Sequence, residues 1–352
     1  MRGSADGDVC GDDEGAIMIH ENEVVEKTNG VKHVIQNFWV ESVSEFVQAI
    51  CTIDRSLIRN GLDTNEVMLF RGHADLDYEI IPSIGRGRKS SVDVSLFNEE
   101  RNMIEMAKYK LPNIFRNDMQ PLELLALLQH HGIPTRLLDV TENALVALYF
   151  ACCSQKEKDG EVIVFRHNEQ SIASYPLINA IADTYRLIGT DNCDISFEWF
   201  FNAAINQPYF FEQCQLVKIM QTREDWRNKW IEANCSKPHF VYAPIHSMRQ
   251  QIQRGRYLLF PNQIIDSEDG KKFAAYIEPL SKEHECVIGE IGIEAKNKEA
   301  MLADLRAFGI SHEILFADNT DAVCQGIVND AKGKNQGRMW AYGTPIPIWE
   351  NR

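Results

Sequence analysis

The segment QHHGIPTRLLDVTENALVALYF, residues 129–150, combines a core-forming pattern with an unusual density of polar side chains. Its second half is apolar enough for a buried helix beginning near Glu142, and Thr141 suits the N-cap of that helix. Its first half places two histidines, a threonine, an arginine and an aspartate within eleven positions. Upstream, Pro121 suits the first turn of a helix and Gly132 its end. The segment therefore predicts helix, strand and helix in succession.

The predicted strand in the middle of this segment has one polar edge. Its polar residues alternate with apolar ones: Thr135, Asp139 and Thr141. Asp139 and Arg136 are three positions apart, so in an extended chain they point to opposite faces. Asp139 then needs another partner, and Arg71 is the natural candidate. The functional interpretation is a polar pocket wall where His130 gives or takes a proton. The structural alternative is that these side chains cap the two neighbouring helices.

A second polar stretch is FRGH, residues 70–73, which follows the short apolar strand VMLF. Arg71 can grip a phosphate or carboxylate with two parallel hydrogen bonds. Gly72 has no side chain, so a ligand can approach its peptide group closely. The alternative is a turn glycine beside an arginine that is paired with a structural acid.

A third stretch, RQQIQRGRYLLF, occupies residues 249–260. Arg249, Gln253 and Gly255 precede an apolar strand, and a glutamine at a strand edge can bind a sugar hydroxyl or an amide. The alternative is a helix C-terminus that ends at Gly255.

Composition excludes several classes of protein. The chain has 352 residues, 44% of them hydrophobic, and a formal net charge of -15, which argues against a protein built to grip a nucleic-acid backbone. Its nine cysteines are scattered without a CxxC pair, so we expect reduced thiols and no metal site. The N-terminus lacks a signal-peptide pattern, and no apolar run is long enough to span a bilayer. These features predict a cytoplasmic protein that does not enter membranes.

The order of predicted elements is mixed, which favours an α+β fold with a largely antiparallel mixed sheet and surrounding helices. We expect an acidic flexible tail at 1–35 that can contact a protein partner, a domain at 36–330 with a mainly helical insertion at about 171–235, and a C-terminal extension at 331–352. Residues 38–53 show helical spacing that includes Trp39. HEILFAD, residues 312–318, is expected to be a strand, 297–309 a helix closed by Gly309, and 320–333 a last helix.

These stretches resemble the FRG domain family, named for its Phe/Tyr-Arg-Gly motif. The resemblance extends over about residues 40–330 and rests on FRGH, IIPSIGR at 80–86, LLALLQHHGIPTRLLDVTENALVALYFA at 124–151, DGEVIVF at 159–165, RQQIQRGRY at 249–257 and the unit beginning EIGIEAKN at 290. Members of this family are mostly bacterial and phage proteins, which implies a role as a toxin or in phage defence.

A more distant resemblance is to ADP-ribosyltransferases, which often begin their NAD site with Arg-Gly at a strand end. This resemblance implies an ADP-ribosyltransferase-like fold and an NAD site. It implies catalytic roles for Arg71, His130, Asp139 and Gln253. It implies cofactor contacts from Gly72, His73, Thr135, Arg136, Thr141 and Arg249. Gln253 stands where those enzymes usually have a glutamate.

Two other functions remain open from the sequence. The same pocket suits an enzyme of phosphate chemistry that acts on nucleotides or nucleic acids, or a module that senses a ligand or binds a partner without catalysis. The acceptor, if there is one, is a protein or a nucleic acid that the sequence does not identify. Each of these functions requires that Arg71, Asp139 and Gln253 line one cleft, with His130 near it.

Overall fold

The structure is a computed structural model of the chain. It describes residues 23–26, 32–59, 66–86, 96–168, 176–187, 223, 229, 237–245, 247–261, 263–266 and 272–316. Several predicted features lie outside the described residues: most of the insertion at 171–235, the last helix at 320–333 and the extension at 331–352.

An open mixed sheet forms the centre of the described fold. Its strands are β1 (Glu23–Glu26), β2 (Lys32–Val40), β3 (Glu66–His73), β4 (Leu137–Thr141), β5 (Gly160–Asn168), β6 (His239–Val241), β7 (Gly255–Leu259) and β10 (Val287–Ile293). Within the described chain these eight strands lie in the order β1-β2-β10-β5-β3-β4-β7-β6. β2 and β10 run parallel, whereas the other described neighbours run antiparallel. A separate hairpin pairs β8 (Gln263–Asp266) with β9 (Lys272–Tyr276). The predicted α+β fold with a largely antiparallel sheet is confirmed.

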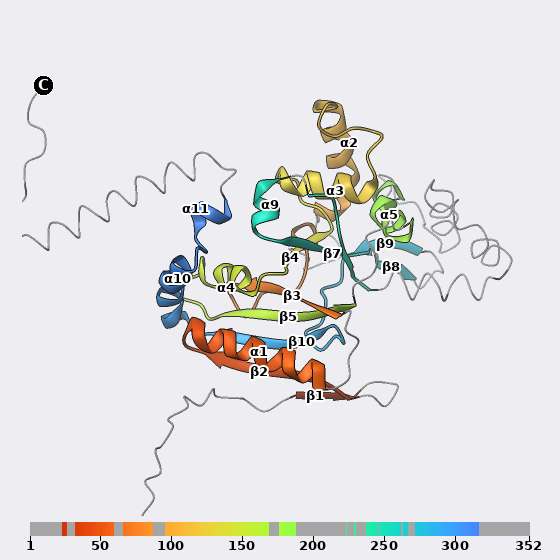
Figure 1. Cartoon of the computed structure of the whole chain (residues 1–352). Helices are drawn as coiled ribbons and strands as arrows, with labels where there is room; N and C mark the ends of the chain where they lie inside the picture. Colours follow the sequence, from red (N-terminus) through yellow and green to blue (C-terminus); the bar gives the residue numbers. More distant parts are fainter. Residues whose placement is uncertain are drawn as a thin grey trace, which may run out of the picture.

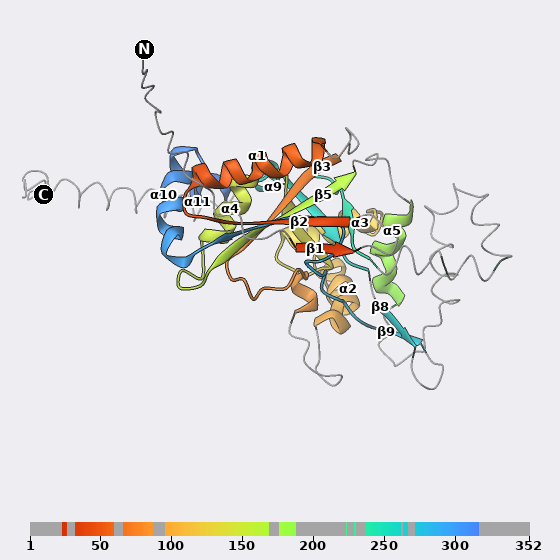
Figure 2. The same ribbon diagram turned by 90° about the horizontal axis from the view of Figure 1, so that it is seen from below.

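The helices pack against the sheet in groups, each of which shares a core cluster with several strands (Figure 1). They are α1 (Val43–Arg59), α2 (Glu100–Lys110), α3 (Pro121–His130), α4 (Ala144–Cys152), α5 (Pro176–Asp183), α9 (Met248–Ile252), α10 (Lys298–Ala307) and α11 (His312–Leu315). α1, α4 and α10 share one core cluster with β2, β3, β5 and β10, and α2, α3 and α5 share another with β4 and β7. α1 lies on one side of the sheet, whereas α2 and the β8-β9 hairpin lie on the other side (Figure 2).

The sheet forks between β3 and β4. β3 pairs with β5 at eight positions, and β4 pairs with β7 at five. Between β3 and β4 themselves, the described pairing consists of Phe70 with Thr141. Beyond that pair the strands diverge, so the residues after Phe70 on β3 and those before Thr141 on β4 border a gap. α3 and α4, which precede and follow β4, stand beside this gap (Figure 1).

Several local predictions are confirmed by the backbone. α3 begins at Pro121, and Gly132 follows its end with φ of 83°. Gly309 follows α10 with φ of 77°. Both glycines adopt the left-handed conformation that commonly closes a helix. The predicted strand before α4 is β4.

Other local predictions need correction. Trp39 belongs to β2, not to the helix that begins at Val43, and its ring covers Gly292 on the neighbouring strand β10. The N-cap of α4 is Asn143, whose side chain accepts a hydrogen bond from the Leu145 N–H, rather than Thr141. Residues 312–315, predicted as a strand, form the short helix α11. The sheet also extends into the segment predicted as a tail, since β1 and the start of β2 lie before residue 36.

Candidate functional site

A cavity of about 180 Å³ lies at the fork of the sheet. β3, β4 and β7 contribute residues to it, as do α3, α4 and α9. One part of its wall is apolar, with Phe70, Val146 and Phe150. The rest carries charged and amide side chains. The cavity is therefore amphipathic and open to ligands that combine an aromatic or sugar part with a charged part.

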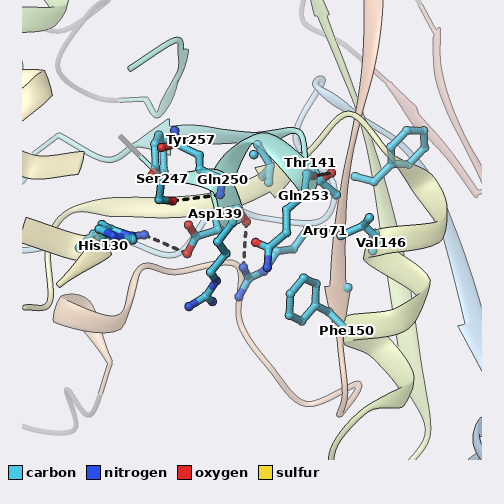
Figure 3. A pocket seen from close by; sticks show the side chains of 17 residues that line it. Arg71, His130, Asp139, Thr141, Val146, Phe150, Ser247, Gln250, Gln253 and Tyr257 are labelled. Atoms are coloured by element: carbon cyan, nitrogen blue, oxygen red, sulfur yellow. Dashed lines mark hydrogen bonds between the residues drawn. The ribbon is translucent and has the colours of Figure 1, made fainter. Parts of the chain in front are cut away.

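Seven of the ten predicted site residues line this cavity. They are Arg71, Gly72, His130, Asp139, Thr141, Arg249 and Gln253. Figure 3 shows Arg71, Asp139 and Gln253 converging, with His130 at one end and Phe150 at the other. The three separate sequence stretches therefore line one cleft, as expected. The roles of the individual residues stay predictions.

Arg71 spans the gap between the two halves of the sheet. Its Nη1 donates a hydrogen bond of 2.8 Å to the backbone oxygen of Asp139. That carbonyl lies in the stretch of β4 that has no described pairing with β3. The arginine side chain therefore takes the place of a main-chain hydrogen bond between the two strands. The sequence predicted an Arg71–Asp139 contact, but the acceptor is the main chain rather than the carboxylate.

The rest of the Arg71 guanidinium is incompletely satisfied. Its Nε is buried and has no hydrogen-bond partner among the described residues. Burial lowers the pKa of Arg71, the charge of Asp139 opposes this shift, and Arg86 adds to it. Arginine stays protonated in proteins despite such a shift. A fixed cation with an unused donor is therefore available at the fork.

Asp139 presents its carboxylate at an exposed position of an otherwise buried strand. Oδ2 accepts a hydrogen bond of 2.9 Å from the Gln129 amide. Within the described part of the chain this carboxylate forms no ion pair. Burial, and to a smaller extent the charge of Asp139, raises the pKa of the neighbouring Tyr257 hydroxyl. Tyr257 is therefore a neutral hydrogen-bonding group in the cavity wall.

Thr141 and Gln253 join β4 to the end of α9. The Thr141 hydroxyl donates a hydrogen bond of 2.6 Å to the backbone oxygen of Gln253. The side-chain amide of Gln253 donates a hydrogen bond of 3.0 Å to the backbone oxygen of Leu315 in α11. Since its nitrogen is used in this way, the amide oxygen of Gln253 is the atom suited to accept a hydrogen bond from a ligand.

Arg249 adds a second cation to the cavity. Its guanidinium lies 4.3 Å from the ring centroid of Phe316, a cation–π contact. Phe316 in turn packs edge-on against Phe150. The side chain of Arg249 is thus held against an aromatic surface in the cavity wall, and a guanidinium can bind an anion with its planar donors.

Arg136 is a structural residue, which corrects its predicted role in cofactor binding. It is fully buried, and its Nε lies 2.9 and 3.0 Å from the two carboxylate oxygens of Glu100. Its other nitrogens donate to the backbone oxygens of Ile181 and Ala182 and to the hydroxyl of Thr184. Arg136 therefore fastens β4 to α2 and to the end of α5, away from the cavity.

Thr135 and His73 also lie outside the cavity, contrary to their predicted cofactor contacts. Thr135 is buried and donates a hydrogen bond of 2.7 Å to Gln129. His73 is 2% exposed, and its Nδ1 lies 3.2 Å from Glu161, which Lys282 contacts from the other side. Burial lowers the pKa of His73 and the hydrogen bond with Glu161 opposes that shift.

The depressed pKa of His73 predicts a loss of stability in acid. The unfolded chain binds a proton at His73 near pH 6.5, whereas the folded chain does so at lower pH. The stabilising contribution is therefore complete above about pH 6.5 and is lost as the pH falls through the folded pKa. Urea unfolding between pH 7 and pH 5 should show a shallower loss for His73→Gln than for the wild type. His131→Gln, which changes an exposed histidine, is the control and should lose stability with falling pH as steeply as the wild type. An equally steep loss in His73→Gln would contradict the assignment of this pH dependence to His73.

Gly72 lines the cavity and also meets a packing requirement that was not predicted from the sequence. A side chain at this position would place its Cβ 2.0 Å from the Ala147 oxygen and 2.7 Å from the Ala151 nitrogen. The glycine therefore allows α4 to pack directly on β3. The helix α4 therefore approaches the Gly72 backbone closely, and the predicted approach of a ligand to the same residue stays a prediction.

Ten other residues line the cavity without having been predicted as site residues, among them Gln129, Phe150 and Tyr257. Gln129 and Phe150 lie at the two ends of the segment 129–150, and Tyr257 lies opposite Asp139 on β7. The position of Gln129 one residue before His130 is the signal that could have indicated it.

The described residues contain no group of three or more His, Cys, Asp or Glu side chains placed to hold a metal ion. Among the helices that the structure describes, none combines the length and the apolar character needed to cross a bilayer.

Comparison with known proteins supports the family assignment. The model of the FRG domain matches residues 66–160, which include β3, α3, β4 and α4. No curated protein and no solved structure matches the chain significantly. The matched segment supplies the fork of the sheet and brings Arg71, His130 and Asp139 to the cavity. The chain therefore contains an FRG domain at residues 66–160.

Proposed function

We propose that this cavity binds NAD and that the protein is an ADP-ribosyltransferase-like enzyme. The observation that carries the proposal is the pairing of opposite charges at the fork. The Arg71 guanidinium has a buried Nε without a partner among the described residues, and the Asp139 carboxylate faces the same cavity without a described ion pair. NAD joins anionic phosphates to a cationic nicotinamide riboside, so both charges have a counterpart.

The size of the cavity indicates which end of NAD enters it. Ligand pockets commonly measure about 300–1,000 Å³, and this cavity of about 180 Å³ is smaller. It suits the nicotinamide and its ribose, against the apolar wall with Phe150. Arg71 and Arg249 would then bind the phosphates near the mouth, with charge-assisted hydrogen bonds.

Asp139 is the residue best suited to assist cleavage. When the bond between C1′ of the ribose and the nicotinamide nitrogen breaks, its electron pair leaves with nicotinamide and positive charge develops on the ribose. A fixed carboxylate stabilises that charge. The resemblance favours Gln253 in this position, but Gln253 is neutral and its amide oxygen is better suited to a ribose hydroxyl. An acceptor hydroxyl or amine bonds to C1′, and His130 can take its proton.

Nicotinamide release from NAD tests this proposal. We expect the wild type to release nicotinamide and Asp139→Asn to lower kcat by about 100- to 1,000-fold, the scale of losing one electrostatic group in an active site. Asp304→Asn, on the exposed face of α10, is the matched control and should retain wild-type activity. Absence of release by the wild type, or full activity in Asp139→Asn, would overturn the proposal.

The same experiment separates the two other functions left open by the sequence. Cleavage of RNA or DNA without NAD would indicate phosphate chemistry at this cavity. A rise in melting temperature with a nucleotide, without turnover of any substrate, would indicate a sensing module. A role in bacterial defence or as a toxin is proposed from the family resemblance, and loss of growth on expression of the wild type but not of Asp139→Asn would support it.

A further inference from the structure

Three residues outside the ligand contacts proposed above form a chain of hydrogen bonds to Asp139. The Leu137 N–H donates to the hydroxyl oxygen of Thr135 over 3.3 Å. The Thr135 hydroxyl donates to Gln129 Oε1 over 2.7 Å, and Gln129 Nε2 donates to Asp139 Oδ2 over 2.9 Å. The chain thus runs from the main chain of β4, through the end of α3, and back to a side chain of β4.

The direction of this chain is fixed by donor and acceptor chemistry. A hydroxyl has one hydrogen and two lone pairs, and the Leu137 N–H occupies one lone pair of Thr135. The hydroxyl hydrogen then points to Gln129 Oε1, which leaves the amide nitrogen toward Asp139. The reverse orientation of the Gln129 amide would place its oxygen against a carboxylate oxygen, where both are acceptors. Each of the three hydrogen bonds therefore joins a donor to an acceptor only in the arrangement described.

Asp139 is consequently held from two sides. Its backbone oxygen accepts from Arg71 on β3, and its Oδ2 accepts from Gln129 on α3. The second carboxylate oxygen, Oδ1, has no hydrogen-bond partner among the described residues and remains available to the cavity. Thr135, which is 1% exposed, does not line the cavity.

We infer that Thr135 and Gln129 are positioning residues that set the orientation of the Asp139 carboxylate for cleavage. This inference rests on the proposed function. It predicts that the Thr135 hydroxyl affects the reaction although Thr135 touches no ligand. The effect passes through Gln129 to Asp139 and is absent where Asp139 has no charge to position.

The matched pair Thr135→Val and Thr135→Ser tests the inference, because valine keeps the shape and loses the hydroxyl whereas serine keeps the hydroxyl. Thr135→Val should lower kcat for nicotinamide release by about 10- to 100-fold, since small misplacements of a catalytic group have effects of this size. KM should change little, and Thr135→Ser should retain wild-type kcat. In the Asp139→Asn background, Thr135→Val should cause no further loss.

Gln129→Met provides a second route if Thr135→Val does not fold, because it breaks the same chain and leaves Thr135 in place. It should lower kcat, and it should have no effect in the Asp139→Asn background. Equal kcat in Thr135→Val and Thr135→Ser, or equal losses with and without the Asp139 charge, would overturn the positioning role alone. Absence of nicotinamide release by the wild type would overturn the proposed function as well.

Discussion

Replacing Arg136 by methionine should lower the free energy of unfolding by about 3–5 kcal/mol, the usual cost of removing one partner of a buried ion pair. Glu100 is buried and loses its ion-pair partner, and the Ala182 carbonyl loses its guanidinium donor. Total stabilities of domains are about 5–15 kcal/mol, so this loss is a large part of the whole. Urea unfolding at pH 7 measures it.

The pH dependence of this variant identifies Glu100 as the cause. Burial raises the pKa of Glu100 even in the wild type, where Arg136 opposes the shift. Without Arg136 the folded pKa rises further above the unfolded value of about 4.3. A raised folded pKa means that stability is present at low pH and lost as the pH rises through that pKa. The deficit of Arg136→Met should therefore shrink between pH 7 and pH 5.

A double variant supplies the control. Arg136→Met combined with Glu100→Met removes the uncompensated charge and should recover part of the lost stability. If the double variant loses, relative to the wild type, the full sum of the two single losses, the ion pair is not the reason for the loss.

Replacing Gly72 by alanine should lower the free energy of unfolding by more than about 3 kcal/mol, the upper range for overpacking a core. The added methyl group would lie 2.0 Å from the Ala147 oxygen, and a backbone atom of a packed helix cannot move aside as a side-chain end can. α4 and β3 would have to separate, and the cavity between them would change shape. Denaturant unfolding measures the loss, and near-ultraviolet circular dichroism reports the altered packing.

Gly255→Ala is the matched control, since its methyl group would lie 3.4 Å from the flexible side chain of Gln250. We expect a change within about 1 kcal/mol, as for substitutions without a steric conflict. Wild-type stability in Gly72→Ala would show that the α4–β3 contact is not as close as described.

The segment 129–150 allowed much of the site to be predicted, because its local signals agree with one another. Pro121 and Gly132 bracket α3, and the alternation that ends at Thr141 marks β4. Local signals failed where long-range pairing or a single turn decides the structure. Trp39 fits a helical spacing but pairs in β2 with β10, about 250 positions away in the chain. α11 has four residues, too few to show a helical period.

The roles of individual polar residues were harder to predict than the fact that many of them line one cavity. Arg136, directly before β4, and Asp139 on β4 have different partners, as expected, but the sequence did not show that α2 and α5 enclose Arg136. Arg136 was therefore assigned to the cofactor and belongs to the core. Gln129 was missed because its importance depends on Thr135 and Asp139 together, a geometry that appears only when α3 packs beside β4.

The proposed function depends on Arg71 holding an anionic ligand at the fork of the sheet. Isothermal titration calorimetry of NAD against the wild type, Arg71→Gln and Arg306→Gln measures this directly, since Arg306 lies on the exposed face of α10. We predict saturable binding to the wild type and to Arg306→Gln. Arg71→Gln should bind about 10- to 100-fold more weakly, the effect of losing charge-assisted hydrogen bonds. Equal affinity in Arg71→Gln and the wild type, or no binding to either, would contradict the account.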